Sequence, residues 1–326
     1  MKPRHFITLQ DLDRPTILQL FRTASELKQE RSASARPAAT HPRRGTSSAA
    51  GTVPPRPLAG KTLGLLFQKP SVRTRVSFEV GMAQLGGTSL YIGPVELEGG
   101  KREAPKDVAR VLSRYLDGIV ARTFRHSEVE EMARYSDIPV INGLSDASHP
   151  CQALADLLTV QEKVGHLKGT QIAYVGDGNN VCHSLMEGCA LLGVHLAVAA
   201  PKGYQPDPAV TQWAGQQAKR SGAKIEIFTR PSPAVRGASI VYTDVWTSMG
   251  QEQEKARRQK AFRGFQVTSR MMKQAGRGAL FMHCLPAHRW EEVSDEVMDS
   301  RQSIVYDQAE NRLHVQKAIL LMLLKR

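Results

Sequence analysis

Hydroxyl and guanidinium groups alternate in the segment Ser71-Val72-Arg73-Thr74-Arg75, which follows an apolar run and precedes the helix-like sequence VSFEVGMAQLG. The first turn of a helix carries unpaired backbone N–H groups and the positive end of the helix dipole. With two arginines and two hydroxyls added, such a turn would bind an anion, most naturally a phosphate group. An ordinary helix cap with solvated arginines explains the same residues, so both interpretations stay open here.

Two glycine-containing segments invite a nucleotide-binding interpretation that their residues do not favour. Gly176-Asp177-Gly178-Asn179-Asn180 follows a strand-like run, but Val181 stands where a dinucleotide fingerprint has its third glycine. Gly60-Lys61-Thr62 lacks the upstream glycine of a P-loop, because Pro55 occupies that position. Nicotinamide or nucleoside triphosphate binding is therefore not the expected chemistry.

A histidine, a glutamine and a cysteine complete the set of reactive side chains. His149-Pro150-Cys151-Gln152 opens a helix-like run, where His149 and Gln152 would face a ligand or would simply cap the helix around a buried imidazole. Cys284 follows an apolar run and could be a nucleophile, a ligand contact or an inert buried thiol. Covalent catalysis would need a base beside the thiol, and the sequence places none there.

Short apolar runs alternating with helix-like stretches must position these residues. The alternation predicts an α/β fold of two doubly wound domains with parallel sheets, linked by helices. In such sheets ligands bind beyond the carboxyl ends of the strands, where the polar segments above are found. The predicted strands are 62–67, 89–93, 118–123, 139–144, 171–176, 194–201, 224–229, 239–244, 279–285 and 303–308.

The domain boundaries follow from composition and helical spacing. We expect one domain over residues 1–148, completed by a C-terminal helix at 309–326 whose apolar spacing runs over 311–324, and another over 149–308, which includes a linker helix at 149–165. A first helix is expected at 11–29. Residues 31–57 are rich in Ala, Ser, Pro, Gly and Arg, which predicts a flexible surface insertion.

Bulk composition excludes several classes of protein. The chain of 326 residues has a formal charge of +13, but five arginines and no acid lie in 31–57, and no aromatic-interleaved basic stripe appears elsewhere, so nucleic-acid binding is disfavoured. None of the four cysteines forms a CxxC pair, which argues against a zinc site. No apolar run reaches the roughly 20 residues of a membrane helix, and the N-terminus lacks the apolar core of a secretory signal. These features predict a cytoplasmic protein.

Taken together and in order, several segments resemble the ornithine carbamoyltransferase family. They are SVRTRVSFE, VART, HPCQALAD, VGDGNN, DVWTSMG, HCLPAHR and DQAENRLH, and the resemblance covers about residues 2–30 and 58–326. It implies an enzyme of arginine biosynthesis or of arginine and ornithine catabolism, which makes citrulline from carbamoyl phosphate and ornithine. It also implies an N-terminal carbamoyl-phosphate domain, an ornithine domain, a homotrimer or a multiple of trimers, and no metal or organic cofactor.

The resemblance assigns roles residue by residue. Arg122, His149 and Cys284 would be catalytic. Gln152 would join Arg122 and His149 in holding the phosphate and carbonyl oxygens, and the loop 244–250 would close over ornithine. Carbamoyl phosphate would be bound by Ser71, Val72 through its backbone, Arg73, Thr74, Arg122, His149, Gln152, Cys284, Leu285 and Arg312, and ornithine by Asn180, Asp244, Ser248 and Met249.

Three positions depart from the family pattern. Val72 stands where threonine is common, Glu98 where glutamine is common, and Trp290 where glycine is common. Rival hypotheses are a carbamoyltransferase for another amine (putrescine, N-acylated ornithine or, least favoured, aspartate), a basic nucleic-acid-binding protein acting through 31–57, and a scaffold without activity. The motif SMG with Asp244 favours an acceptor that carries a free α-amino group.

Overall fold

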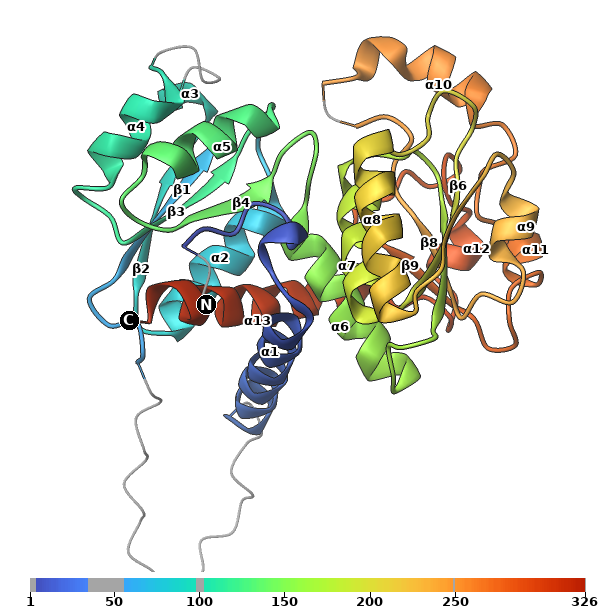
Figure 1. Cartoon of the computed structure of the whole chain (residues 1–326), viewed down its shortest axis with the longest axis horizontal. Coiled ribbons are helices and arrows are strands. Elements are labelled where there is room, and N and C mark those ends of the chain that lie inside the picture. Colours follow the sequence, from blue (N-terminus) through green and yellow to red (C-terminus); the bar gives the residue numbers. More distant parts are fainter. Residues whose placement is uncertain (1–3, 35–55, 98–102, 249, 326) are drawn as a thin grey trace, which may run out of the picture.

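The computed structural model describes residues 4–34, 56–97, 103–248 and 250–325, which form two parallel sheets side by side (Figure 1). The first sheet has the strand order β2-β1-β3-β4, with bounds Thr88–Ile92, Thr62–Phe67, Gly118–Arg122 and Val140–Leu144. The second has the order β7-β6-β5-β8-β9, with bounds Ile225–Phe228, His195–Ala199, Gln171–Val175, Ile240–Thr243 and Leu280–His283. All the pairings between these strands are parallel, which confirms the predicted fold class.

Helices cover both faces of the first sheet because its strands are apolar on both sides. Leu63, Leu65 and Phe67 of β1 point into one core, which is shared with α1 (Arg14–Ser34) and α2 (Val72–Gln84). Leu66 points the other way, toward a smaller core built by helices of the opposite face. These are α4 (Pro105–Leu112) and α5 (His126–Tyr135), and the short α3 (Pro94–Leu97) lies beside them.

The second sheet is built in the same way. Ile172 and Tyr174 of β5 pack toward α7 (Asn180–Leu192) and α8 (Pro208–Ser221). Ala173 and Val175 pack toward the opposite face. That face carries the short elements α9 (Pro231–Val235), η3 (Glu252–Glu254), α10 (Lys255–Ala261), α11 (Ser269–Met272) and α12 (Asp295–Met298).

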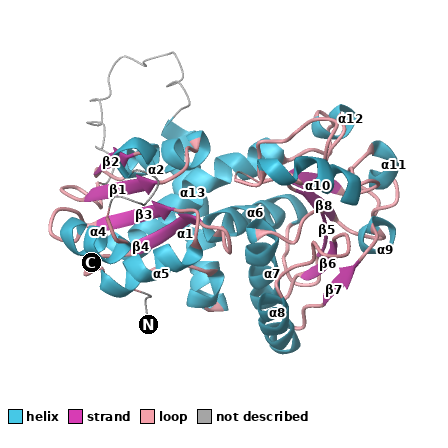
Figure 2. Cartoon of the chain, turned by 90° about the horizontal axis from the view of Figure 1, so that it is seen from above, coloured by secondary structure: helices cyan, strands magenta, loops and turns pink. Residues whose placement is uncertain are grey.

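Two helices join the sheets. α6 (Pro150–Val164) connects β4 to β5, and α13 (Val305–Leu324) runs beside it between the two sheets (Figure 2). Every residue of α6 from Pro150 to Val160 is buried, as expected for a helix that is packed on all sides. One apolar core therefore continues from the first sheet, through α6 and α13, to the second.

The predicted strand at 303–308 is wrong. Ser303 forms only an isolated bridge with Phe281, and α13 begins at Val305, earlier than the predicted helix. The apolar pair Ile304 and Val305 resembles a strand locally, but the residues that follow are mostly good helix formers. The helix therefore extends back through them.

The first helix also differs from its predicted bounds. A short 3₁₀ turn η1 covers Leu9–Asp11, and α1 runs from Arg14 to Ser34. The predicted insertion at 31–57 therefore begins too early, since its first four residues are helical, and Leu58 just after it is fully buried. Most of that segment, residues 35–55, lies outside the described residues. Among the helices described, none is at once long and apolar enough to span a bilayer.

Candidate active site

A cavity lies where both sheets reverse their strand order. In the first sheet the chain reverses between β1 and β3, and in the second between β5 and β8. Ligands of doubly wound sheets bind at such points, beyond the carboxyl ends of the strands. Here Lys69, Arg122, Asp177 and Asp244, which follow these four strands or end them, line a single cavity of about 1060 Å³.

This cavity gathers the residues singled out by the sequence. Its lining includes every predicted site residue in the described part of the chain, while Met249 lies outside the described residues. The members are Ser71, Val72, Arg73, Thr74, Arg122, His149, Gln152, Asn180, Asp244, Ser248, Cys284, Leu285 and Arg312. These residues therefore lie together around one cavity, and the role of each remains a prediction.

The N-terminus of α2 forms one wall of the cavity. Ser71 is the N-cap, and its hydroxyl accepts a hydrogen bond from the Thr74 backbone N–H at 3.4 Å. The Ser71 hydroxyl also donates to the Thr74 hydroxyl at 3.1 Å, and Arg312 Nη2 of α13 donates to the same Thr74 oxygen at 2.9 Å. The helix-cap and the anion-binding interpretations of this segment are therefore compatible. The capped turn lines the cavity, and Arg312 of α13 is hydrogen-bonded to it.

Four cations line this side of the cavity. Lys69, Arg73, Arg122 and Arg312 form no ion pair with an acidic residue of the described chain. Burial and the charge of Arg122 lower the pKa of Lys69 to about 8. Burial, Arg312 and Arg73 lower the pKa of Arg122 to about 9. Mutual repulsion in a desolvated wall is a cost that a bound anion would relieve.

His149 is neutral in this environment. Burial first, and then the charges of Arg312 and Arg122, hold the pKa of the imidazole well below its usual value. Its position is fixed through the backbone, since the His149 N–H donates to Ser184 Oγ of α7 at 2.8 Å. A neutral imidazole presents one N–H donor and one acceptor nitrogen.

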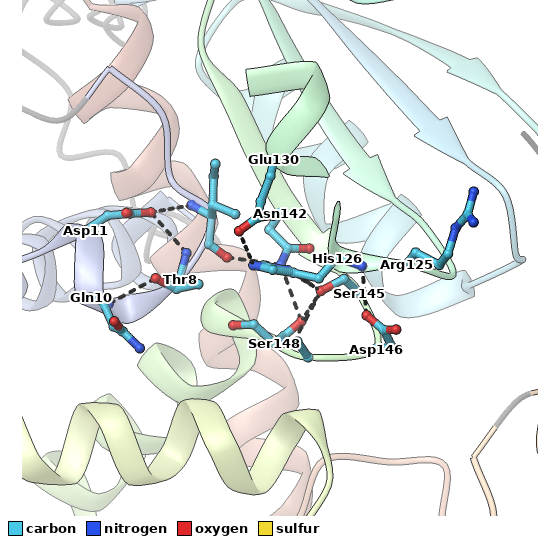
Figure 3. A network of polar contacts seen from close by, with 12 residues as sticks. Thr8, Gln10, Asp11, Arg125, His126, Glu130, Asn142, Ser145, Asp146 and Ser148 are labelled. Carbon is cyan, nitrogen blue, oxygen red and sulfur yellow. Dashed lines mark hydrogen bonds and ion pairs between the residues drawn. The ribbon is translucent and has the colours of Figure 1, made fainter. Parts of the chain in front are cut away.

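A polar network fixes the loop 145–148 that leads into His149 (Figure 3). Ser145 Oγ is hydrogen-bonded to His126 Nδ1 at 2.7 Å and accepts from Asn142 Nδ2 at 3.2 Å. The backbone N–H of His126 donates to Asp146 Oδ1 at 2.7 Å. From the other sheet, Asn180 Nδ2 donates to the Ser145 carbonyl at 2.6 Å. The loop is therefore held from both sides of the cavity.

Several polar atoms of the lining are buried without a hydrogen-bond partner among the described residues. They are Arg122 Nε, His149 Nδ1, Gln152 Oε1 and Arg312 Nε. Leaving a buried polar group unpaired costs about 1–3 kcal/mol. Four such atoms in one cavity are expected when the partner is a polar ligand.

Gln152 can offer the cavity only an acceptor. Its Nε2 donates to Asp156 Oδ1 at 2.9 Å and to Gln308 Oε1 at 2.7 Å, which uses both amide hydrogens. The role that the resemblance gave it, holding oxygen atoms of the ligand, would require a free N–H. The structure instead leaves Oε1, which would accept a hydrogen bond from an N–H group.

The opposite wall is anionic. Asp244 accepts hydrogen bonds from Asn179 Nδ2 at 2.7 Å, from the Val245 N–H at 2.8 Å and from the Cys284 thiol at 2.9 Å. Burial and the charge of Asp244 raise the pKa of Cys284 well above its usual value, so the thiol stays protonated. A protonated thiol that donates to a carboxylate is not an activated nucleophile.

Lys69, Asp177 and Arg258 also line the cavity but were not singled out from the sequence. Arg258 Nη1 donates to Asp177 Oδ2 at 2.7 Å and to the Trp246 carbonyl at 3.0 Å, which ties the start of the loop 244–250 to the end of β5. Burial raises the pKa of Asp177 to about 6. Lys69 could have been found from its place two residues before Ser71, whereas nothing near Arg258 in the sequence distinguishes it.

Of the three departures from the family pattern, two fall on described residues. The Val72 side chain is 77% exposed at the first position of α2, so the backbone is what it can offer a ligand. Trp290 has φ 71°, a left-handed conformation that glycine adopts at little cost, which explains why glycine suits this position. Glu98 lies outside the described residues.

Asp244, His283 and Cys284 have ligand atoms within 4.8 Å of one another, as a metal site would need. Both nitrogens of His283 are engaged, however. Nε2 lies 3.2 Å from Glu292 Oε1, and Nδ1 accepts from the Leu285 N–H at 2.8 Å. With the thiol protonated as well, this donor set does not fit a metal.

Comparisons with known proteins agree with this geometry. Residues 4–162 match the family model of the aspartate/ornithine carbamoyltransferase carbamoyl-P binding domain, and residues 168–323 match that of the Asp/Orn binding domain. The chain is 51% identical over 324 residues to an ornithine carbamoyltransferase of Symbiobacterium thermophilum, with 99% of each protein covered. It is 57% identical over 271 residues to that of Pyrococcus horikoshii, which covers 83% of this chain and 86% of the relative.

Solved structures are similar over the whole chain. The ornithine carbamoyltransferase of Pyrococcus furiosus superimposes with a TM-score of 0.90 at 50% identity, covering 98% of this chain and 97% of the other. The anabolic enzyme of Campylobacter jejuni superimposes with a TM-score of 0.88 at 38% identity, covering 98% of each chain. With both family models matched and relatives this similar, the chain belongs to the aspartate/ornithine carbamoyltransferase family.

Proposed function

We propose that this chain transfers the carbamoyl group of carbamoyl phosphate to the δ-amino group of L-ornithine, giving L-citrulline and phosphate. The observation that carries the proposal is the polarity of one cavity, with four buried or half-buried cations on one wall and Asp244 on the other. The first wall suits a phosphate dianion, and Asp244 suits the α-amino cation of an amino acid. The relatives named above support the same reaction.

Carbamoyl phosphate would bind at the carboxyl ends of β1 and β3. Arg73 and the N-terminal turn of α2 would hold the phosphate, with Lys69 as a further cation. Arg312 would complete this subsite from α13, which supports assigning the C-terminal segment that contains this helix to the domain of residues 1–148. Gln152 Oε1 would accept a hydrogen bond from the carbamoyl amide.

The chemistry is nucleophilic attack of the neutral δ-amine on the carbamoyl carbon, which forms the C–N bond. The C–O bond to phosphate then breaks, and the departing phosphate takes up the proton that the attacking nitrogen loses. Negative charge grows first on the carbonyl oxygen, where Arg122, His149 and Thr74 can donate hydrogen bonds, and then on the leaving phosphate, where Arg73 can. Removing one such donor typically costs about 10²–10³ in rate. Cys284 would contact the substrates while its thiol stays protonated. Since side chains and the N-terminal turn of α2 would supply this charge stabilisation, the proposal requires no metal or organic cofactor.

L-Ornithine would occupy the wall formed by the second sheet. Asp244 would bind its α-amino group, and Asn180, Ser248 and Met249 would complete the subsite. The hydrogen bond from Arg258 to the Trp246 carbonyl supports a defined position for the start of the loop 244–250, at residues 244–246. Putrescine has no α-amino group beside a carboxylate, and N-acylated ornithine has no α-amino cation, so both would use this wall less well.

We further propose a homotrimer, or a multiple of trimers, as the working assembly. An apolar stripe is exposed along α2 at Val72, Val76 and Val80, and Leu90 of the adjacent edge strand β2 is also exposed. Contiguous exposed apolar surface of this kind supports an interface. Light scattering after size exclusion would test it, with Val76→Asp expected to shift the mass toward the monomer. Trimer mass unchanged in the variant would argue for a different interface.

A cytoplasmic role in arginine biosynthesis is part of the proposal. All four cysteines are buried and unpaired, which suits a reducing compartment. A relative from Pyrococcus furiosus that is 56% identical over 271 residues is named an anabolic ornithine carbamoyltransferase. Fractionation of source cells would test the location, because secretion or membrane association would contradict it.

The test of the reaction is citrulline formation by the purified protein with carbamoyl phosphate and ornithine. Putrescine, N-acetylornithine and aspartate are assayed beside ornithine at equal concentration. We expect ornithine to be preferred. Preferred turnover of another amine would keep the carbamoyl-phosphate subsite but overturn the roles of Asp244 and Ser248. Binding of carbamoyl phosphate without turnover of any acceptor would instead indicate a scaffold.

A further inference from the structure

We propose that Asp156 is a positioning residue that fixes the amide of Gln152 with its oxygen toward the cavity, and so makes the site select a carbamoyl group over an acetyl group. The inference rests on the proposed function, because it concerns how carbamoyl phosphate is recognised. It concerns a residue that does not line the cavity and that would act only through Gln152.

Asp156 lies one helical turn after Gln152 on α6 and is fully buried. Its Oδ1 accepts the hydrogen bond from Gln152 Nε2 at 2.9 Å, and its Oδ2 accepts one from the Tyr242 hydroxyl of β8 at 3.0 Å. A carboxylate can only accept hydrogen bonds. It therefore requires the NH₂ end of Gln152 to face it.

Gln308 of α13 imposes the same orientation. Its Nε2 donates to the backbone carbonyl of His283 at 2.6 Å, and that carbonyl has no alternative to accepting. The Gln308 amide is therefore fixed with Oε1 toward Gln152, which donates to it at 2.7 Å. A flipped Gln152 would place its carbonyl oxygen against two acceptors at once, which is costly in a buried site.

The fixed orientation has a consequence for the ligand. Gln152 Oε1 is buried and has no hydrogen-bond partner among the described residues, and its side chain lines the cavity. The carbamoyl NH₂ can donate to it, whereas the methyl of an acetyl group of nearly the same shape cannot. Sites built around a buried polar group discriminate strongly against ligands that leave that group unpaired. If the amide were free to flip, this discrimination would be lost.

The acceptor role of Asp156 also depends on pH. Burial raises the pKa of Asp156 to about 7, so lowering the pH through 7 adds a proton to the carboxylate. A protonated Asp156 no longer requires the NH₂ end of Gln152, and the preference for carbamoyl over acetyl should then fall. The titratable groups that face Asp156 are Tyr242 of β8, Asp244 after it, Cys284 after β9, Arg312 of α13 and Cys189 of α7.

The experiment measures dissociation constants for carbamoyl phosphate and acetyl phosphate from ligand-induced shifts in melting temperature, which need no turnover. The readout is the ratio of the two constants, because the phosphate contacts common to both ligands cancel. Wild type, Asp156→Asn, Gln152→Ala and the double variant are compared at pH 8. Thr159→Val is the matched control, since Thr159 is buried on the same helix one turn further and bonds the Ala155 carbonyl and Asn311, not Gln152.

We expect wild type and Thr159→Val to prefer carbamoyl phosphate, and Asp156→Asn to lose at least tenfold of that preference. The asparagine of the Asp156→Asn variant can present its NH₂ to Gln152 Oε1, so a flipped amide would meet one opposing acceptor, Gln308 Oε1, in place of two. In the Gln152→Ala background the Asp156→Asn change should leave the ratio where it is. For wild type, the preference should fall between pH 8 and pH 5.5, and this arm needs no variant to fold.

Three results from the variants and the pH series would each overturn the inference. One is an unchanged ratio in Asp156→Asn, another is an equal effect of Asp156→Asn with and without Gln152, and the third is a wild-type ratio that is flat from pH 8 to pH 5.5. Equal binding of both ligands by wild type would overturn it as well while leaving the proposed reaction intact. Failure of wild type to bind carbamoyl phosphate at all would overturn both proposals.

Discussion

Replacing Arg122 with methionine should have opposite effects on the stability of the free protein and on ligand binding. Arg122 is 7% exposed, and its side chain makes no hydrogen bond or ion pair within the described residues. Burial and the neighbouring Arg312 and Arg73 lower its pKa to about 9, so keeping it protonated at neutral pH costs on the order of 5 kcal/mol. Methionine removes the charge at similar length.

We expect the free variant to be more stable. Taking roughly half of that cost, about 2 kcal/mol, to allow for local relaxation, and an unfolding entropy near 0.7 kcal/mol/K for 326 residues, the melting temperature should rise by about 3 °C. Carbamoyl phosphate binding should weaken by about 3 kcal/mol, or roughly 100-fold, because a desolvated charge-assisted contact is lost. Arg122 would then be a residue that lowers the stability of the free protein and strengthens ligand binding, as is common in binding sites.

The assay is a melting curve with and without carbamoyl phosphate, with inorganic phosphate as a second ligand. Arg110→Met is the matched control, since Arg110 lies on the surface helix α4 of the same domain and pairs with Asp107 at 3.2 Å, with the two side chains 56% and 47% exposed. Its melting temperature should change by less than about 1 °C. A lower melting temperature for Arg122→Met, together with unchanged ligand binding, would refute the reasoning that the cationic wall is built for an anion.

Four further outcomes follow from the second wall of the cavity. Asp244→Asn should raise the KM for ornithine by about 10–100-fold and leave that for carbamoyl phosphate within about threefold, by steady-state kinetics. Cys284→Ala should keep kcat within about tenfold, because the thiol is protonated, and complete loss would indicate a nucleophile instead. Arg258→Met should raise the ornithine KM by about tenfold. Burial raises the Asp177 pKa to about 6, so the carboxylate needed for the pair with Arg258 is present above pH 6 and lost below it. The wild-type ornithine KM should therefore rise more steeply as the pH falls through 6 than that of Arg258→Met, in which only the protonation of the δ-amine changes with pH.

Local sequence predicted the sheets well because buried parallel strands read as short apolar runs between polar turns. TLGLLF at 62–67 and QIAYV at 171–175 are of this kind, and both are central strands. The failure at 303–308 has a clear cause. Ile304 and Val305 are followed by residues that favour a helix, and the packing of α13 against α6 decides the outcome.

The sequence could predict those site residues that are marked by their own neighbourhood in the chain, such as the end of a strand. The strand-end rule, applied to the predicted parallel sheets, placed Ser71 and Arg122 at the ligand-binding end of one sheet and Asp244 at that of the other. The bond between Thr74 and Arg312, which lie 238 residues apart, comes from the way α13 returns to α2 and has no local feature in either segment.

Asp156 shows a different limit. In the sequence Asp156 is an acid within the apolar run ALADLLTV. A single acid at such a position is also found on the solvent-exposed face of a surface helix. Only the burial of α6 on all sides makes it a fully buried carboxylate. An ionisable residue inside a helix whose other faces are all apolar is the feature that could have identified it.

The central claim is that carbamoyl phosphate occupies the cationic wall and ornithine the Asp244 wall of one cavity. The most direct test is a pair of KM values, one for each substrate at saturation of the other, measured for wild type, Arg122→Met and Asp244→Asn. Each variant should raise the KM of its own substrate at least tenfold and that of the other by less than about threefold. If both variants raised both KM values equally, or if each raised the KM of the other's substrate, the assignment of the two walls would be contradicted.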